Sequence, residues 1–181
     1  MHTLVKTAAA VHNLSLATAF GGPLFARVGL RPALIKDIKD EKERGRVAAC
    51  AWAKYSKINV PAHVAFTVTW LIERHAIKHL SPDHRTQKLV AFKSLLIAGA
   101  LLTGVANHAV GKKLMREYPD GIPVSDKHSS DPRVRAYRRY FKVMGTANLV
   151  FVGASLAIGP AIAGSVIHSL RRNILARLLA K

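Results

Sequence analysis

Four stretches of this 181-residue chain contain no Asp, Glu, Lys or Arg. They run for 20, 15, 18 and 28 residues, over 7–26, 58–72, 94–111 and 143–170. A helix needs roughly 20 predominantly apolar residues to cross the hydrocarbon core of a bilayer, within a range of about 17–25. The first and fourth stretches are long enough, and so is the third once its apolar flank 89–92 is counted. We therefore expect a membrane protein built from helices.

The second stretch is the shortest, and its assignment as a span is open. It reaches the length of a span only if it extends to Ile77, with Glu73 and Arg74 near one interface as an ion pair or as two solvated charges. A buried or re-entrant helix is the alternative.

The first stretch has features of a signal peptide, because Lys6 precedes an apolar run that is followed by small residues. However, His12, Asn13 and Ser15 interrupt that run. We interpret it as a retained membrane helix.

The predicted fold class is all-α, an integral membrane four-helix bundle with amphipathic flanking helices in a single domain. The expected spans are about 4–28, 58–77, 89–111 and 141–169, joined by loops 29–57 and 112–140 and followed by an interfacial tail 170–181. Basic and apolar residues alternate in that tail, which is typical of a helix lying in the membrane interface. A further helix is expected over 40–57.

The basic charge has an explanation that does not involve nucleic acid. The chain carries 28 Lys and Arg against 10 Asp and Glu, but half of its residues are apolar, and the charges lie between the apolar stretches. Lys and Arg that flank spans contact anionic headgroups, at about 1 kcal/mol each. The expected partner is therefore a bilayer with anionic headgroups, and no nucleic acid.

The distribution of Lys and Arg predicts an orientation. Loops 29–57 and 112–140, with their flanks, carry 18 of the 28 basic residues, and the opposite side carries nine. The side richer in Lys and Arg is normally cytoplasmic. We expect both termini outside the cytoplasm, in a plasma (inner) membrane.

Several classes of protein are excluded. Cys50 is the only cysteine, which excludes a disulfide scaffold, a CxxC redox pair and a quinone reductase that needs paired cysteines. The apolar content excludes intrinsic disorder. The sequence contains no G-x-S-x-G, HExxH or glycine-rich phosphate loop, so no hydrolase motif stands out.

Small residues recur four apart in the fourth stretch and predict close helix packing. One row is Gly153, Ala157 and Ala161, and the other is Ser155, Gly159 and Ala163. Such rows allow two helix backbones to approach closely in lipid. We expect this face to contact another helix, within the bundle or in a partner subunit.

Polar residues at membrane depth gather in two predicted layers. The outer layer holds His12, Asn13, Glu73, Arg74, His75, Lys93 and His168, and the cytoplasmic layer holds His63, Asn107, His108 and Asn148. Ionisable groups inside spans are costly and mark functional sites by default. Histidines on facing helices can hold haem iron or copper. His12 is the first candidate for a metal ligand, because it lies deep in its span.

Each of these residues also has a structural interpretation. His75 and His168 lie near interfaces, where solvation explains them. His63 and His108 are equally well explained by hydrogen bonds across helices. Lys93 is expected to extend its ammonium group toward the interface.

The order of motifs resembles one membrane superfamily. His12 is followed by Gly21-Gly22-Pro23-Leu24-Phe25, which is similar to the first helix of CopD-type copper-resistance domains and of the HemJ type of protoporphyrinogen oxidase. The third span opens at Lys93 and closes with Gly111-Lys112-Lys113-Leu114-Met115-Arg116, and this resembles the corresponding HemJ helix. The run Arg138-Arg139-Tyr140-Phe141-Lys142-Val143-Met144 resembles the start of the HemJ fourth helix.

The resemblance implies a four-helix membrane protein that carries haem b. His12 then matches the first-helix haem ligand, Met115 matches the methionine, and Lys93 matches the functional lysine. His63 and His108 are further candidates for cofactor binding.

Two functions therefore stay open. The first is an accessory or structural subunit of a larger membrane complex, or a homo-oligomer, packed through Gly153, Ala157, Gly159 and Ala163. The alternative is a haem b-binding membrane oxidoreductase of HemJ-like type. A transporter is a third option, but four short helices make a complete transport path only by oligomerising.

Overall fold

Helices make up nearly all of the computed structural model, which describes residues 2–80, 83–124 and 131–179. The elements are α1 (His2–Phe25), a π-helical turn η1 (Ala26–Leu30), α2 (Arg31–Asp37), α3 (Glu41–Leu80), α4 (His84–Glu117) and α5 (Pro132–Leu179). No strand occurs in these three ranges. The prediction of an all-α chain is confirmed.

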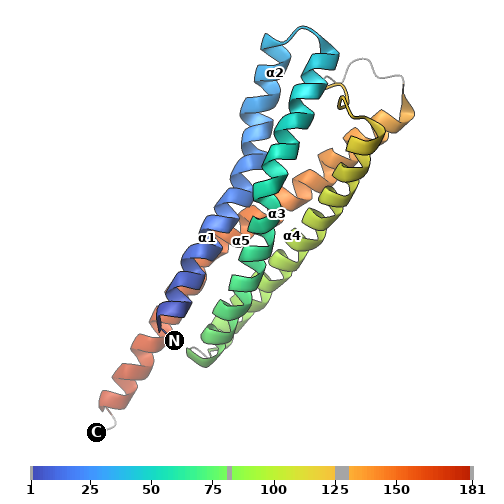
Figure 1. Ribbon diagram of the computed structural model, residues 1–181. Coiled ribbons are helices and arrows are strands. Elements are labelled where there is room, and N and C mark those ends of the chain that lie inside the picture. The colour runs from blue at the N-terminus through green and yellow to red at the C-terminus, as the bar shows by residue number, and fades with distance from the viewer. Residues whose placement is uncertain (1, 81–82, 125–130, 180–181) are drawn as a thin grey trace.

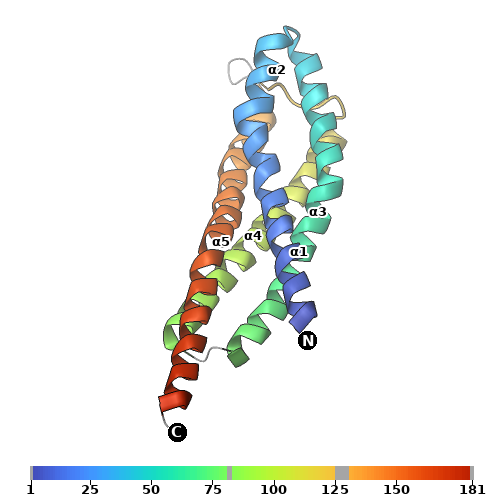
Figure 2. The same ribbon diagram turned by 90° about the vertical axis from the view of Figure 1, so that its left-hand side faces the viewer.

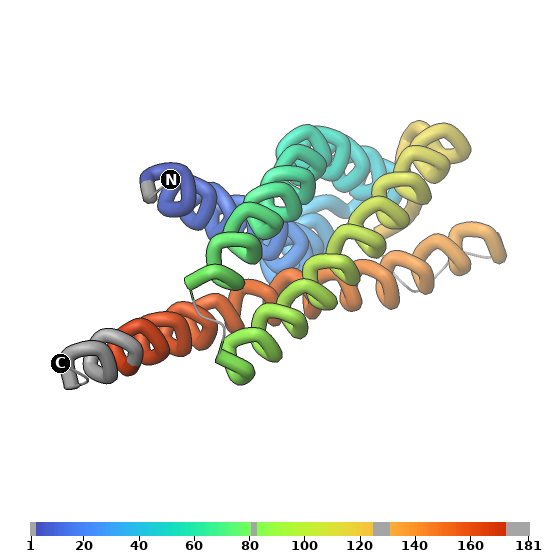
Figure 3. The backbone as a smooth tube through the Cα atoms, turned by 90° about the horizontal axis from the view of Figure 1, so that it is seen from below, coloured from blue at the N-terminus to red at the C-terminus, as the bar shows by residue number. Residues whose placement is uncertain are grey.

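The four long helices run up and down in an antiparallel bundle (Figure 1). The start of α1, the end of α3, the start of α4 and the end of α5 lie at one end. The other end holds α2, the end of α4 and the start of α5, and we call it the loop end (Figures 1 and 2). The most extensive packing is between α4 and α5 and between α1 and α3, and α1 also packs on α5 (Figure 3).

Local sequence explains where the helices start and stop. Asp83 precedes α4, and its carboxylate caps the helix by accepting a hydrogen bond from the Thr86 N–H. This hydrogen bond lowers the pKa of Asp83. Acidic Glu41 and Glu43 occupy the first turn of α3, where they complement the positive end of the helix dipole. The last turn of the same helix carries basic residues.

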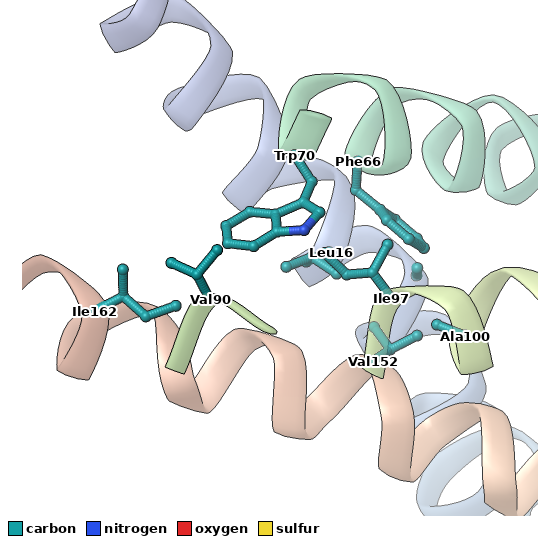
Figure 4. Close-up of a cluster of buried hydrophobic side chains, with 9 residues drawn as sticks. Leu16, Phe66, Trp70, Val90, Ile97, Ala100, Val152 and Ile162 are labelled. Carbon is teal, nitrogen blue, oxygen red and sulfur yellow. The ribbon is translucent and has the colours of Figure 1, made fainter. Parts of the chain in front are cut away.

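The hydrophobic core lies where all four long helices meet (Figure 4). Its buried members are Leu16 and Ala19 of α1, Phe66 and Trp70 of α3, Val90, Ile97 and Ala100 of α4, and Val152 and Ile162 of α5. Glycines allow large side chains to approach: a Cβ on Gly153 would lie 2.8 Å from Phe20, and one on Gly99 would lie 3.0 Å from Phe151. Close van der Waals packing of these side chains holds the helices together.

The helices extend well beyond the predicted spans. The helix expected over 40–57 and the span expected over 58–77 form one continuous helix, α3. The span expected over 141–169 lies inside α5, which starts at Pro132. The predicted tail continues α5 as far as Leu179, and its last two residues lie outside the described part of the chain.

Two helices of the described chain are long and apolar enough to cross a membrane. These are α4 and the portion of α5 from Pro132 to Arg172. By the same measure, α1 and α3 are not apolar enough. An all-helical protein with two possible membrane-spanning helices is therefore what the structure shows.

Candidate functional site

The His12 side chain is fully enclosed in the bundle. It is 0% exposed, and its Nδ1 lies 2.9 Å from the Phe66 carbonyl oxygen. A carbonyl oxygen can only accept a hydrogen bond, so Nδ1 carries the proton of the neutral imidazole and donates it. The Nε2 atom then has a free lone pair. That Nε2 is buried and has no hydrogen-bond partner among the described residues.

Two ionisable residues lie beside this histidine, the buried Lys93 and the mostly enclosed Glu73, whose side chain is 13% exposed. The Glu73 Oε1 atom lies 3.9 Å from His12 Nδ1, and it accepts no hydrogen bond from the described residues. Lys93 is only 3% exposed, and its ammonium nitrogen lies 4.5 Å from the centre of the Trp70 ring. The same indole lies 5.8 Å from the His12 imidazole. We call His12, Thr69, Trp70, Glu73 and Lys93 the buried polar cluster.

Helical periodicity explains how α3 supplies three members of this cluster. Thr69, Trp70 and Glu73 follow Phe66 by three, four and seven residues, so all lie on one face of the helix. Thr69 also approaches His12, with its hydroxyl oxygen 3.3 Å from Nδ1. The face that closes the core therefore also carries the polar groups.

Lys93 does not extend to the interface, so that expectation is wrong. On α4 it lies three residues after Val90 and four before Ile97, both of which are in the core. Its ammonium group contacts the indole face and interacts electrostatically with Glu73 and His12. An aromatic face and a buried carboxylate together provide the negative charge density that a cation needs at this depth.

His63 of α3 repeats the arrangement of His12, which lies on α1. It is 7% exposed, and its Nδ1 donates to the Asn59 carbonyl oxygen at 2.9 Å. Its Nε2 is also buried and has no hydrogen-bond partner in the described part of the chain. Gly104 of α4 faces this ring, and a Cβ there would lie 2.7 Å from Nε2 and 2.6 Å from Cδ2. The imidazole thus occupies space that only a glycine leaves free.

The asparagines of the predicted cytoplasmic layer form hydrogen bonds between helices. Asn148 of α5 donates to the Ala100 carbonyl at 2.8 Å and to the Thr103 hydroxyl at 2.9 Å. Asn107 donates to the Met144 carbonyl at 3.5 Å. Side-chain hydrogen bonds of this kind hold helices together in apolar surroundings. Asn148 and Asn107 are therefore explained by packing.

Several predicted site residues are not brought to the buried polar cluster. His75, His168, Asn13 and Met115 are exposed, whereas Arg74 and His108 are partly exposed. Met115 lies about six helical turns beyond Lys93 on α4, about 33 Å at about 1.5 Å per residue. Met115 and His12 therefore do not meet at one metal ion in this conformation.

The residues around His12 could supply one ligand to a haem iron, but not two. The lone pair of the His12 Nε2 suits iron, and a neighbouring carbonyl fixes the tautomer, as is usual for metal-binding histidines. His63 is the other buried imidazole with this property. In the described residues, no three His, Cys, Asp or Glu side chains form a metal-binding group. A macrocycle at His12 requires the side chains packed over its ring to move, because the ring is fully enclosed.

The small-residue rows of α5 divide into two parts. Gly153 faces Phe20, and Ser155 is fully buried, so this part packs inside the bundle. Ala157 and Ala163 are exposed, and a Cβ on Gly159 would have no atom within 4 Å. The second part of the predicted packing face therefore has no helix packed closely on it within the described ranges.

Trp70 and Thr69 were not predicted as site residues. The available signal was their spacing, since Trp70 lies three residues before Glu73 in an otherwise apolar stretch.

Comparison of this chain with known protein families, curated proteins and solved structures gave no match. The function proposed below depends on this chain's own residues.

Proposed function

We propose that this chain is a multi-pass membrane protein whose four long helices all cross the bilayer, and that it is a subunit of a larger membrane assembly. The observation that carries the proposal is that buried polar groups beside the hydrophobic core are combined with many large apolar side chains on the outside. The interior encloses ionisable and polar groups, including His12, His63 and Lys93. The outside of the bundle exposes large apolar side chains on every long helix.

The exposed apolar residues are large and numerous. They include Val11 and Leu14 on α1, Ile58, Val64, Val68 and Leu71 on α3, Phe92, Leu95, Leu102 and Val105 on α4, and Val143, Val150 and Ile167 on α5. Soluble monomers rarely expose large contiguous apolar patches. In contact with lipid tails, the same side chains are in their preferred surroundings.

The lower hydropathy of α1 and α3 is compatible with a spanning role. Both helices contribute to the buried polar cluster, so their polar side chains lower the average while facing the protein interior. Polar groups inside membrane proteins typically face the bundle interior and pair with one another. The faces that α1 and α3 would turn to lipid are therefore largely apolar, with Asn13 as an exposed polar residue on α1.

The outer part of the α5 rows supports assembly with another helix. Ala157, Gly159 and Ala163 are small residues, and no helix packs closely on them in the part of the chain that the structure describes. Close backbone approach at small residues drives helix association in membranes. The proposed orientation places the loop end in the cytoplasm and both termini outside, in a plasma (inner) membrane.

Extraction and size measurement test this proposal. The protein should stay in the membrane pellet after alkaline carbonate washing and should elute from a gel-filtration column in mild detergent as an assembly. Gly159→Leu should disperse that assembly, because the added side chain separates the helix backbones. Gly111→Leu is the matched control, since it also faces open space but lies outside the α5 rows.

Protein in the carbonate supernatant would contradict the membrane assignment. An unchanged elution volume for Gly159→Leu would contradict assembly through α5.

A second candidate function is a haem b-binding membrane oxidoreductase. The specific observation in its favour is the buried, unpartnered Nε2 of His12, with Nδ1 anchored on the Phe66 carbonyl. His12 would supply one ligand to the iron, and the Lys93 ammonium group, which lies near this histidine, would interact with a porphyrin carboxylate. When bound, the haem would supply one-electron chemistry.

Absorption spectra of the purified protein, oxidised and dithionite-reduced, test the haem proposal. A Soret band is expected in the wild type, and His12→Ala should abolish it because the axial ligand is lost. His75→Ala is the control and should keep the band, since this histidine is exposed on α3. A wild-type spectrum without a Soret band, or full haem occupancy in His12→Ala, would overturn the assignment.

A further inference from the structure

A groove lies between α4 and α5 near the loop end and has a volume of about 670 Å³. Lys113 and Glu117 of α4 line one wall, and Arg133, Tyr137 and Tyr140 of α5 line the other. These side chains recur at helical spacing, so each set forms one face of its helix. We call this feature the α4–α5 groove.

The groove has a net positive charge and an unused donor. Lys113 and Arg133 bring two positive charges, and Glu117 brings one negative charge. Glu117 accepts a hydrogen bond from the Tyr137 hydroxyl at 2.8 Å and lies 3.8 Å from the Lys113 ammonium group. The Tyr140 hydroxyl oxygen is buried and has no hydrogen-bond partner among the described residues. A buried donor without a partner is costly, and an incoming anion would satisfy it.

An apolar hollow follows along α5 beyond the groove. It is lined by Lys142, Val143, Thr146, Ala147, Val150 and Phe151, and nearly all of its exposed surface is apolar. Val143 and Val150 are among the exposed residues of the proposed lipid-facing surface. Val110, at the floor of the α4–α5 groove, belongs to the charge-free stretch 94–111. The groove therefore lies where the apolar surface ends and the basic surface begins.

From this juxtaposition we propose that the α4–α5 groove binds the phosphate headgroup of an anionic phospholipid, with an acyl chain along the apolar hollow of α5. Lys113, Arg133 and the Tyr140 hydroxyl contact the phosphate. Basic pockets between membrane helices bind anionic headgroups in this manner. A free phosphate ion would use the groove but would leave the apolar hollow bare. The inference rests on the proposed membrane location.

Native mass spectrometry of the detergent-solubilised protein, titrated with dioleoyl phosphatidylglycerol or dioleoyl phosphatidylcholine, tests the site. Phosphatidylglycerol should bind more tightly to the wild type. The double variant Lys113→Gln/Arg133→Gln should bind it about 30-fold more weakly, which is about 2 kcal/mol for two charges. Tyr140→Phe should weaken binding without any change in net charge.

Lys112→Gln/Arg116→Gln is the matched control. It removes two exposed charges from the same part of α4, outside the groove, and should leave the preference for phosphatidylglycerol in place. Equal losses in both double variants would overturn the site, because binding would then reflect surface charge alone. Competition by inorganic phosphate at equal concentration would assign the groove to free phosphate. If the protein stays in the membrane pellet but does not prefer phosphatidylglycerol over phosphatidylcholine, only this inference is refuted. If the protein appears in the carbonate supernatant, the proposed membrane location is refuted.

Discussion

Lys93→Met is expected to reduce the free energy of unfolding by about 3–5 kcal/mol. The substitution keeps the shape of the side chain but removes the charge that interacts with Glu73 and the Trp70 ring. Glu73, whose side chain is only 13% exposed, then lacks its cationic neighbour, and removing one partner of an enclosed charge pair costs about this much. The loss can be measured as the fraction unfolded by a denaturing detergent in mixed micelles.

A double-mutant cycle separates the charge interaction from side-chain packing. Lys93→Met/Glu73→Gln removes both charges, so it should recover most of the stability lost in Lys93→Met alone. Lys88→Met is the control, because this lysine is exposed on the same helix, and its effect should stay within about 0.5 kcal/mol. Additive losses in the double variant would show that the two charges do not stabilise each other.

Gly104→Ala should destabilise the bundle by about 1–3 kcal/mol, the usual cost of an overfilled core. The added methyl group would lie 2.6 Å from the His63 Cδ2 atom. The imidazole is held on the Asn59 carbonyl by its Nδ1, so it cannot withdraw without losing that hydrogen bond. The change in thermal unfolding midpoint, measured by circular dichroism in detergent, reports the cost.

His63→Ala provides the second half of this test. In the His63→Ala background the space beside residue 104 is open, so adding Gly104→Ala should cost no further stability. Gly111→Ala is the control, since no atom lies within 4 Å of its added methyl group. A Gly104→Ala protein as stable as the wild type would mean that His63 does not occupy this position.

The helical architecture was predictable because its signal is local. Charge-free stretches separated by basic segments fix the number of long helices, and the short connection between α3 and α4 requires them to be antiparallel. The merging of the helix expected over 40–57 with the span beginning at residue 58 was not predicted. Lys54 and Lys57 set the predicted boundary, but both lie on exposed positions of α3, where a charge does not interrupt a helix.

The site was only partly predictable, because its geometry depends on how each helix is rotated about its axis. His12, Glu73 and Lys93 were placed in one layer from their depth, and the structure brings these three together. Met115 matched a motif but lies far along α4 from the buried polar cluster. A motif match does not show at which depth in the bundle a residue lies. Trp70 was missed since its role is to contact Lys93, and that contact exists only after α3 and α4 have packed.

Membrane topology is the central claim, and the single cysteine makes it directly testable. Cys50 is exposed on α3, on the loop-end side of the proposed span. In intact cells or right-side-out vesicles, a membrane-impermeant maleimide should label Cys50 only after permeabilisation. In the Cys50→Ser background, Asp120→Cys should behave like Cys50, whereas Lys6→Cys and His84→Cys should be labelled before permeabilisation. Labelling of Cys50 and of His84→Cys from the same side would mean that α3 does not cross the membrane, and would contradict the four-span account.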